Sequence, residues 1–78
     1  MGFRYFVQQQ ANALNIKGWV RNRLDERVEI LALGEENHLN AFTARVRVGP
    51  SMANVTRVDV EWVATEVEFK RFSIAPTD

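Results

Sequence analysis

Residues 17–33 read KGWVRNRLDERVEILAL, and this stretch has the form of a β-hairpin. Residues 19–22 predict a short strand, and residues 23–26 predict a turn. Beyond the turn the side chains alternate with strand periodicity, with Val28, Ile30 and Ala32 on one face and Arg27, Glu29 and Leu31 on the other. The other elements of the fold are predicted from the segments on either side of this hairpin.

An amphipathic segment precedes the hairpin. Its apolar residues recur at helical spacing and predict a helix over residues 3–14: Phe3, Phe6, Val7, Ala11 and Leu14. Asn15 and Gly18 follow this segment as C-terminal signals, because both residue types tolerate the backbone conformation that ends a helix.

A second amphipathic segment follows the hairpin, which Gly34 ends. Leu39, Phe42 and Val46 form one apolar face and predict a helix over residues 36–47. Glu35 and Glu36 suit the helix start, because acids are favourable at the positive end of the helix dipole. Gly49-Pro50-Ser51 breaks the helix.

The last third of the chain predicts two further strands. Val58, Val60 and Trp62 alternate with polar residues, which predicts a long strand over residues 54–63. Phe69, Phe72 and Ile74 indicate a short strand over residues 68–74. The order α-β-β-α-β-β favours an α+β layer, in which an antiparallel sheet carries both helices on one face.

Composition narrows the classes of function. Seventy-eight residues make one domain, and zero net charge gives no bulk attraction to nucleic acid or membrane. The sequence has no cysteine, no apolar run of membrane-spanning length and no signal-peptide pattern. We therefore expect a cytoplasmic protein. Arginine outnumbers lysine eight to two, and solvated faces are the usual cause of such a skew.

Two polar residues stand at the ends of predicted elements. Arg4 lies at the start of the first helix, where unpaired backbone N–H groups and the helix dipole favour an anion. Its guanidinium can add two parallel, charge-assisted hydrogen bonds to phosphate oxygens. Asn22 ends the first hairpin strand, and its amide carries the donor and the acceptor that hold a water molecule. Taken alone, a solvated arginine and a turn asparagine are the ordinary interpretations.

The order of short motifs resembles the acylphosphatase family. GFRYFV (residues 2–7) precedes GWVRN (residues 18–22), and VEI, GP and VTRVDVEW follow. The resemblance runs from Gly2 to about Ile74. It implies a ferredoxin-like βαββαβ fold and hydrolysis of acyl phosphates to a carboxylate and inorganic phosphate, with no metal or cofactor. It also maps the phosphate-binding arginine onto Arg4 and the water-positioning asparagine onto Asn22.

The sequence departs from the family pattern in two places. Asp25-Glu26 stands where the family usually has Asp-Gly, which indicates a different turn or some strain. The family also carries a strand and a glycine-containing loop, broadly GRVQGV, before GFR. That strand lies in the middle of the sheet, between the strand after the second helix and the second hairpin strand. Residues 1–78 are therefore expected to form one N-terminally truncated domain with impaired activity.

The sequence also leaves other functions open. One alternative is a weak or inactive ferredoxin-like interaction module that self-associates or exchanges strands through open sheet edges. RNA-binding domains share the topology, but the sequence has no basic surplus and no obvious aromatic pair for bases. A domain that handles carbamoyl phosphate in a larger maturation protein is disfavoured by the length. His38 has no second histidine or cysteine partner, so a surface histidine is expected rather than a metal site.

Overall fold

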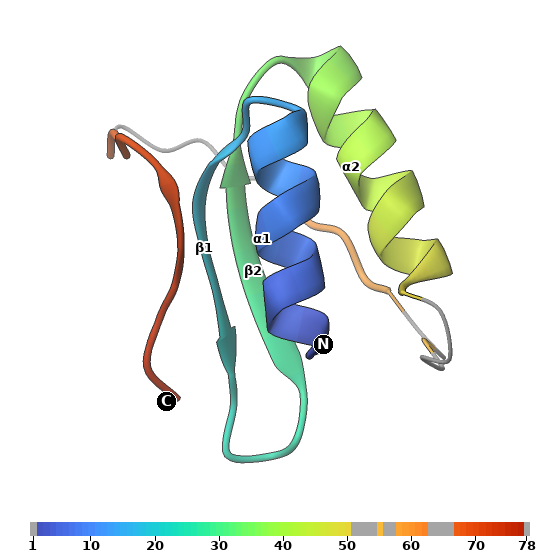
Figure 1. Ribbon diagram of the computed structural model, residues 1–78, viewed down its shortest axis with the longest axis vertical. Coiled ribbons are helices and arrows are strands. Elements are labelled where there is room, and N and C mark those ends of the chain that lie inside the picture. The colour runs from blue at the N-terminus through green and yellow to red at the C-terminus, as the bar shows by residue number, and fades with distance from the viewer. Residues whose placement is uncertain (1, 51–54, 56–57, 63–66, 78) are drawn as a thin grey trace.

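The protein is a two-layer α+β structure in which two helices lie on one face of a sheet (Figure 1). The computed structural model describes residues 2–50, 55, 58–62 and 67–77. Its elements, in chain order, are α1 (Phe3–Ala13), β1 (Lys17–Asn22), β2 (Val28–Leu33), α2 (Glu36–Val48) and β3 (Phe72–Ile74). The α+β class expected from the sequence is confirmed.

The hairpin forms where the sequence predicts it. Strands β1 and β2 pair antiparallel, from Lys17 opposite Leu33 to Asn22 opposite Val28. Within the turn, the Arg23 N–H donates to the Arg27 carbonyl at 2.8 Å. Glu26 has a φ of +71° in this turn. The strain expected from Glu26 in a place that suits glycine is therefore present.

The sheet is mixed, although the sequence favoured an antiparallel one. Its order is β2-β1-β3, and β3 runs parallel to β1 with Gly18 opposite Phe72. Strand β3 is also shorter than the expected 68–74, because only Phe72–Ile74 has β1 as a hydrogen-bonding neighbour. Alternation identifies an extended segment, but strand direction and strand length depend on the neighbour.

The strand expected over residues 54–63 is not present in its described part. Residues 55 and 58–62 belong to no strand, and the rest of that range lies outside the described residues. A strand needs hydrogen bonds to a neighbour, and the described sheet ends at β2. The alternating pattern of residues 58–62 is therefore real, but no described strand pairs with it.

Helix ends follow local signals with one exception. Asn15 follows α1 with a φ of +56°, and Gly49 ends α2 with a φ of +74°. Gly18, expected as a helix-end signal, instead lies inside β1. A Cβ built there would fall 1.9 Å from the Leu31 carbonyl oxygen of β2. Gly18 is therefore needed for the close approach of the two strands.

The core lies between the sheet and the helices. Its buried residues come from α1, the following loop, β1, α2 and β3: Val7, Ala11, Ile16, Val20, Phe42, Val46 and Phe72. Phe42 and Phe72 meet edge to face, with ring centroids 6.1 Å apart. No helix in the described part of the chain is long and apolar enough to cross a membrane.

Candidate active site

The fold brings the start of α1 and the end of β1 to the same end of the molecule. Helix α1 and strand β1 run in opposite directions and are joined by a short connection (Figure 1). The helix advances ~13 Å from Arg4 to its last residue, at 1.5 Å per residue. The strand returns ~17 Å to Asn22 at ~3.3 Å per residue. The two lengths nearly match, so Arg4 and Asn22 lie at one level of the fold.

Asn22 shares the helix-facing side of β1. Side chains alternate along a strand, and Val20, two residues earlier, is fully buried in the core. Trp19 and Arg21 therefore occupy the opposite face of the sheet. Asn22 is half-buried at the edge of the core, as is Arg4. Arg4 belongs to α1, which lies on this same side of the sheet (Figure 1).

The N-terminus of α1 is open to an anion. Gly2 caps the helix in an extended conformation, with no side-chain hydrogen bond and no acid in the first turn. The Phe6 N–H already bonds to the Gly2 carbonyl at 3.1 Å, and the N–H groups before it have no partner within the helix. The positive end of the helix dipole is thus not compensated by a carboxylate from this turn.

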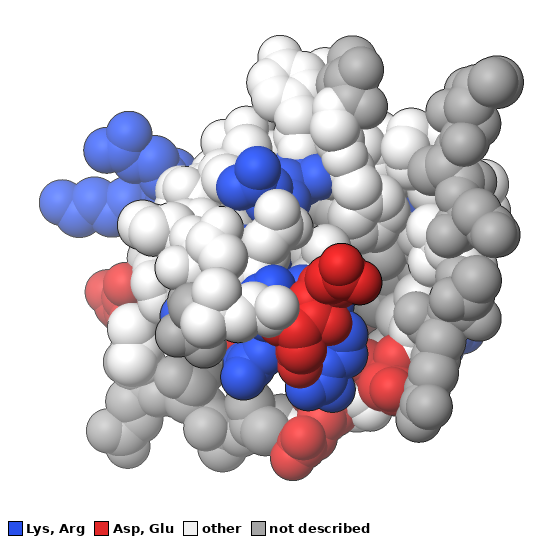
Figure 2. Space-filling model, turned by 90° about the horizontal axis from the view of Figure 1, so that it is seen from below, with Lys and Arg blue, Asp and Glu red and all other residues white. Residues whose placement is uncertain are grey.

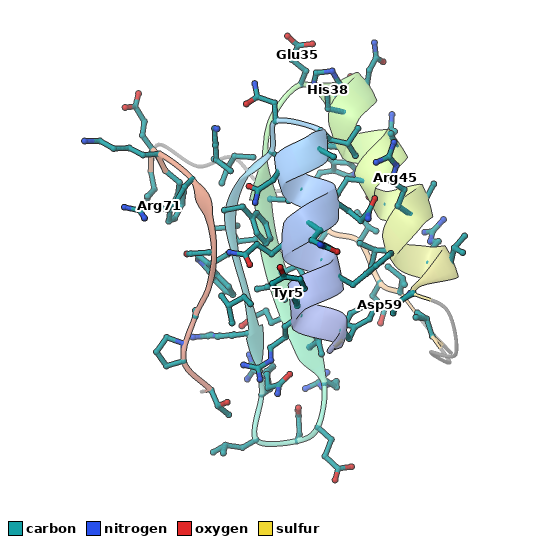
Figure 3. All side chains as sticks on the ribbon, in the orientation of Figure 1. Tyr5, Glu35, His38, Arg45, Asp59 and Arg71 are labelled. Carbon is teal, nitrogen blue, oxygen red and sulfur yellow. The ribbon has the colours of Figure 1, made fainter. Side chains whose placement is uncertain are left out.

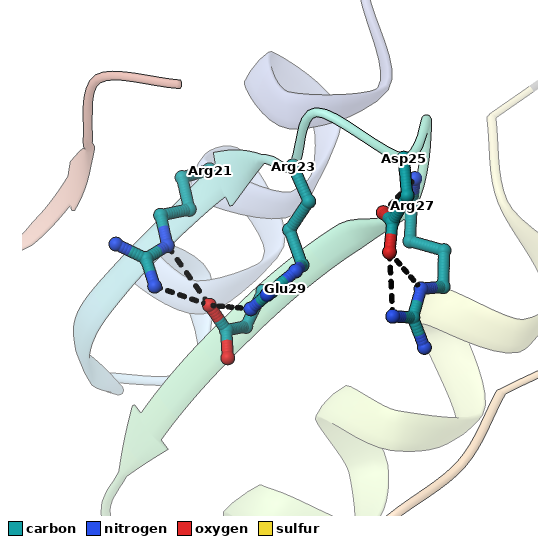
Figure 4. Close-up of polar contacts among 5 residues, drawn as sticks. All are labelled: Arg21, Arg23, Asp25, Arg27 and Glu29. Carbon is teal, nitrogen blue, oxygen red and sulfur yellow. Dashed lines mark hydrogen bonds and ion pairs between the residues drawn. The ribbon is translucent and has the colours of Figure 1, made fainter. Parts of the chain in front are cut away.

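Arginines of the hairpin are held by acids on the hairpin itself (Figure 4). Glu29 Oε1 accepts hydrogen bonds from Arg21 Nε at 2.8 Å and from Arg23 Nη1 at 3.2 Å. These contacts hold the pKa of the Glu29 carboxyl below its usual value, with the Arg21 hydrogen bond as the largest cause. Arg21 also lies over the Trp19 ring, 4.8 Å from its centroid.

The turn carries a second ion pair. Arg27 Nε donates to Asp25 Oδ2 at 2.8 Å, and the Arg27 N–H donates to Asp25 Oδ1 at 3.1 Å. The side-chain bond is the main reason that the pKa of Asp25 is lowered. Figure 2 shows this end of the molecule, where blue cationic and red acidic side chains lie intermixed.

Arg4 differs from these three arginines. Among the described residues, no carboxylate pairs with Arg4, whereas Arg21, Arg23 and Arg27 each contact an acid. A guanidinium without a fixed carboxylate keeps its paired donors available for a ligand. The arrangement at this end can therefore bind an anionic group between Arg4 and the N-terminal turn of α1.

His38 lies far from this end. Figure 3 places it near Glu35 at the opposite end of the molecule from the start of α1. Within the described ranges, no group of three or more histidine, cysteine or acidic residues could hold a metal ion. The Glu29 contacts were not anticipated, although the pairing of Arg21 with Glu29 in the hairpin register was the signal available to find them.

Comparisons with known proteins identify the family of this chain. The family model described as Acylphosphatase matches residues 1–74. An acylphosphatase of Bacillus velezensis is 47% identical over 75 residues, covering 96% of this chain and 83% of the relative. The crystal structure of acylphosphatase from Bacillus subtilis superposes with a TM-score of 0.90 at 46% identity, covering 95% of this chain and 82% of that one.

The same fold also occurs within a much larger protein. The crystal structure of T. kodakarensis HypF matches all of this chain with 10% of its own length, at a TM-score of 0.86 and 28% identity. The fold and the matches together define a small α+β hydrolase with a ferredoxin-like sandwich. The chain belongs to the acylphosphatase family.

Proposed function

We propose that this protein hydrolyses acyl phosphates to a carboxylate and inorganic phosphate, with Arg4 binding the phosphoryl oxygens and Asn22 positioning the attacking water. The reaction class rests on the family match over residues 1–74. The residue roles rest on the common end and common side that α1 and β1 give to Arg4 and Asn22. The inactive-module alternative is not favoured, because the relatives that cover nearly the whole chain are acylphosphatases.

To hydrolyse an acyl phosphate, the protein needs mainly to position the attacking water and to stabilise the negative charge on the phosphoryl oxygens. An acyl phosphate already carries a good leaving group, the carboxylate. As the water oxygen bonds to phosphorus and the bond to the acyl oxygen breaks, negative charge spreads over the phosphoryl oxygens. Catalysis then comes from donors aimed at those oxygens and from an oriented water molecule.

Arg4 and the first turn of α1 supply the donors in this proposal. The guanidinium offers two parallel hydrogen bonds, and the first-turn N–H groups add dipoles that need no rearrangement. The observation that carries the assignment is the start of α1, which has no side-chain cap and no acid in its first turn, with Arg4 lacking an acidic partner among the described residues. Asn22 holds the water through its amide, which accepts one hydrogen bond while it donates another.

The direct test measures hydrolysis of benzoyl phosphate by Arg4→Gln. We expect kcat/KM to fall by about 10² to 10³, the usual loss for one oxyanion donor. Arg47→Gln is the control, because it removes one exposed arginine from the last turn of α2. Equal activity in Arg4→Gln and Arg47→Gln would remove Arg4 from the site.

A second variant separates water positioning from phosphate binding. Asn22→Ala should lower kcat with little change in inhibition by inorganic phosphate, whereas Arg4→Gln should weaken that inhibition. Asn40→Ala removes an exposed asparagine from α2 and serves as the control. If Asn22→Ala weakens phosphate inhibition as much as Arg4→Gln does, Asn22 binds phosphate rather than water.

Two finer points belong to the same proposal. We place the protein in the cytoplasm, which agrees with the absence of cysteine. Self-association through sheet edges stays a prediction, and sedimentation at micromolar concentration tests it.

A further inference from the structure

The end of β1 that carries Asn22 has a strand neighbour on one side only among the described residues. Strand β3 pairs with β1 from Gly18 to Val20, and this pairing ends two residues before Asn22. On the other side, Asn22 lies opposite Val28 of β2. A strand end that is paired on one side opens more easily than one paired on both sides. Asn22 therefore needs further contacts if its amide is to hold a water molecule in one orientation.

Glu29 of β2 supplies such contacts from the open face of the sheet (Figure 4). Its Oε1 accepts hydrogen bonds from Arg21 Nε at 2.8 Å and from Arg23 Nη1 at 3.2 Å. Arg21 Nη2 also lies 2.7 Å from the same oxygen. Arg21 and Arg23 are the residues immediately before and after Asn22. One carboxylate oxygen therefore holds both chain neighbours of Asn22 against β2.

These contacts restrict the side of the sheet that Asn22 can occupy. Side chains alternate along a strand, so two neighbours held on the open face leave the residue between them on the helix-facing side. Helix α1, which carries Arg4, lies on that side (Figure 1). Without the carboxylate, two guanidinium groups of like charge would share one face and repel each other. The end of β1 could then rotate, and Asn22 would move with it.

We propose that Glu29 is a positioning residue for the hydrolysis, which acts through Arg21 and Arg23 to hold the Asn22 amide where it orients the attacking water. This inference rests on the proposed function, because Glu29 has its role only through Asn22. Its carboxylate is engaged on the open face of the sheet, so it needs no contact with the substrate.

A network of this kind affects the rate more than the stability. The side chain of Glu29 is 37% exposed, and ion pairs with such exposure contribute little to the free energy of unfolding. A catalytic group that is misplaced by 1 Å, in contrast, can lower the rate by about 10²-fold. We therefore expect variants of Glu29 to fold and to lose activity.

The test compares Glu29→Gln with Asp25→Asn in the hydrolysis of benzoyl phosphate. Each variant removes one negative charge from the hairpin, but Asp25 pairs with Arg27, which does not adjoin Asn22. Glu29→Gln should lower kcat by about tenfold. It should leave inhibition by inorganic phosphate unchanged, because Arg4 and the start of α1 stay in place. Asp25→Asn should leave both quantities unchanged.

Two further measurements sharpen this comparison. Glu29→Ala removes the accepting oxygen altogether, so its kcat should fall at least as far as that of Glu29→Gln. In the Asn22→Ala background, Glu29→Gln should have no further effect on kcat, because the amide that it positions is gone. A loss of folded protein would instead lower the rate by the same factor in both backgrounds. Urea denaturation verifies that each variant is folded at the assay temperature.

Four results would overturn the inference while leaving the proposed role of Asn22 intact. They are wild-type kcat in Glu29→Ala, equal losses in Glu29→Gln and Asp25→Asn, equal factors in the two backgrounds, and weakened phosphate inhibition in Glu29→Gln. Wild-type activity in Asn22→Ala would be a different failure, because it would remove the proposed role of Asn22 and the inference together.

Discussion

Strands β1 and β2 are partners in one hairpin, yet they have very different surroundings. Strand β1 has a neighbour on each side, and its Gly18 and Val20 are buried. Strand β2 is the more apolar of the two by sequence, but none of its residues is buried. The difference in burial between β1 and β2 therefore follows their places in the described sheet, rather than their own hydrophobicity.

The close contact between the two strands gives the largest expected effect. Gly18→Ala would place a methyl group against the Leu31 carbonyl oxygen in a backbone with a φ of +134°. We expect a loss of about 3–5 kcal/mol in the free energy of unfolding, or failure to fold. Urea denaturation measures it, with Gly2→Ala as the control because nothing lies within 4 Å of its added methyl. Similar stabilities for the two variants would contradict the close approach.

A matched pair of truncations compares the strands directly. Val20→Ala removes two methyl groups from a fully buried residue of β1, and Val28→Ala removes the same atoms from an exposed residue of β2. We expect losses of about 2–3 kcal/mol for Val20→Ala and below about 0.5 kcal/mol for Val28→Ala. Equal losses would mean that β2 is covered in solution, for example by another chain.

A substitution at Glu26 should relieve backbone strain in the turn that joins the two strands. Glu26→Gly replaces a residue at a φ of +71° with one that adopts this conformation freely. We expect a gain of about 0.5–1 kcal/mol in the free energy of unfolding, because relief of the strained backbone exceeds the added chain entropy. Leu24→Gly is the control, since Leu24 is an exposed residue of the same loop without a positive φ. A loss of stability in Glu26→Gly would show that the turn is unstrained.

The ion pairs on the open face of the hairpin give the smallest effect. Glu29 is 37% exposed, so solvent screening limits the loss in Glu29→Gln to below about 1 kcal/mol at pH 7. The pKa of Glu29 is lowered in the folded state, so its contribution is present above the ordinary value of 4.5. It is lost as the pH falls through the lower folded-state value. The stability difference between wild type and Glu29→Gln should therefore shrink with acidification, and a constant difference down to pH 2 would refute this cause.

Local signals were sufficient for much of the fold. The spacing of Phe3, Val7 and Ala11 predicted α1 to within one residue of its observed end. The alternation after the turn predicted β2, and Asn15 marked the end of α1 through its positive φ. The motifs predicted Arg4 and Asn22 as site residues, and their roles stay a prediction; the nearly equal lengths of α1 and β1 place both residues at one end of the molecule.

Other features depended on neighbours that are remote in sequence. The parallel direction of β3, its short length and the lack of a described strand over residues 58–62 all follow from which strand lies alongside. Gly18 has its role because Leu31 approaches it across the hairpin. Glu29 gains two arginines only when the register brings them together.

The sequence by itself determined the two helices, the hairpin and its strained turn, because periodicity and backbone preferences act over a few residues. It also determined the family, through short motifs in a fixed order. The tertiary structure alone decided the sheet order and the lack of an acidic partner for Arg4 among the described residues. Hydrogen bonds, ion pairs and buried contacts between distant segments depend on which surfaces meet in space. A local sequence pattern does not identify the segment that will pack against it.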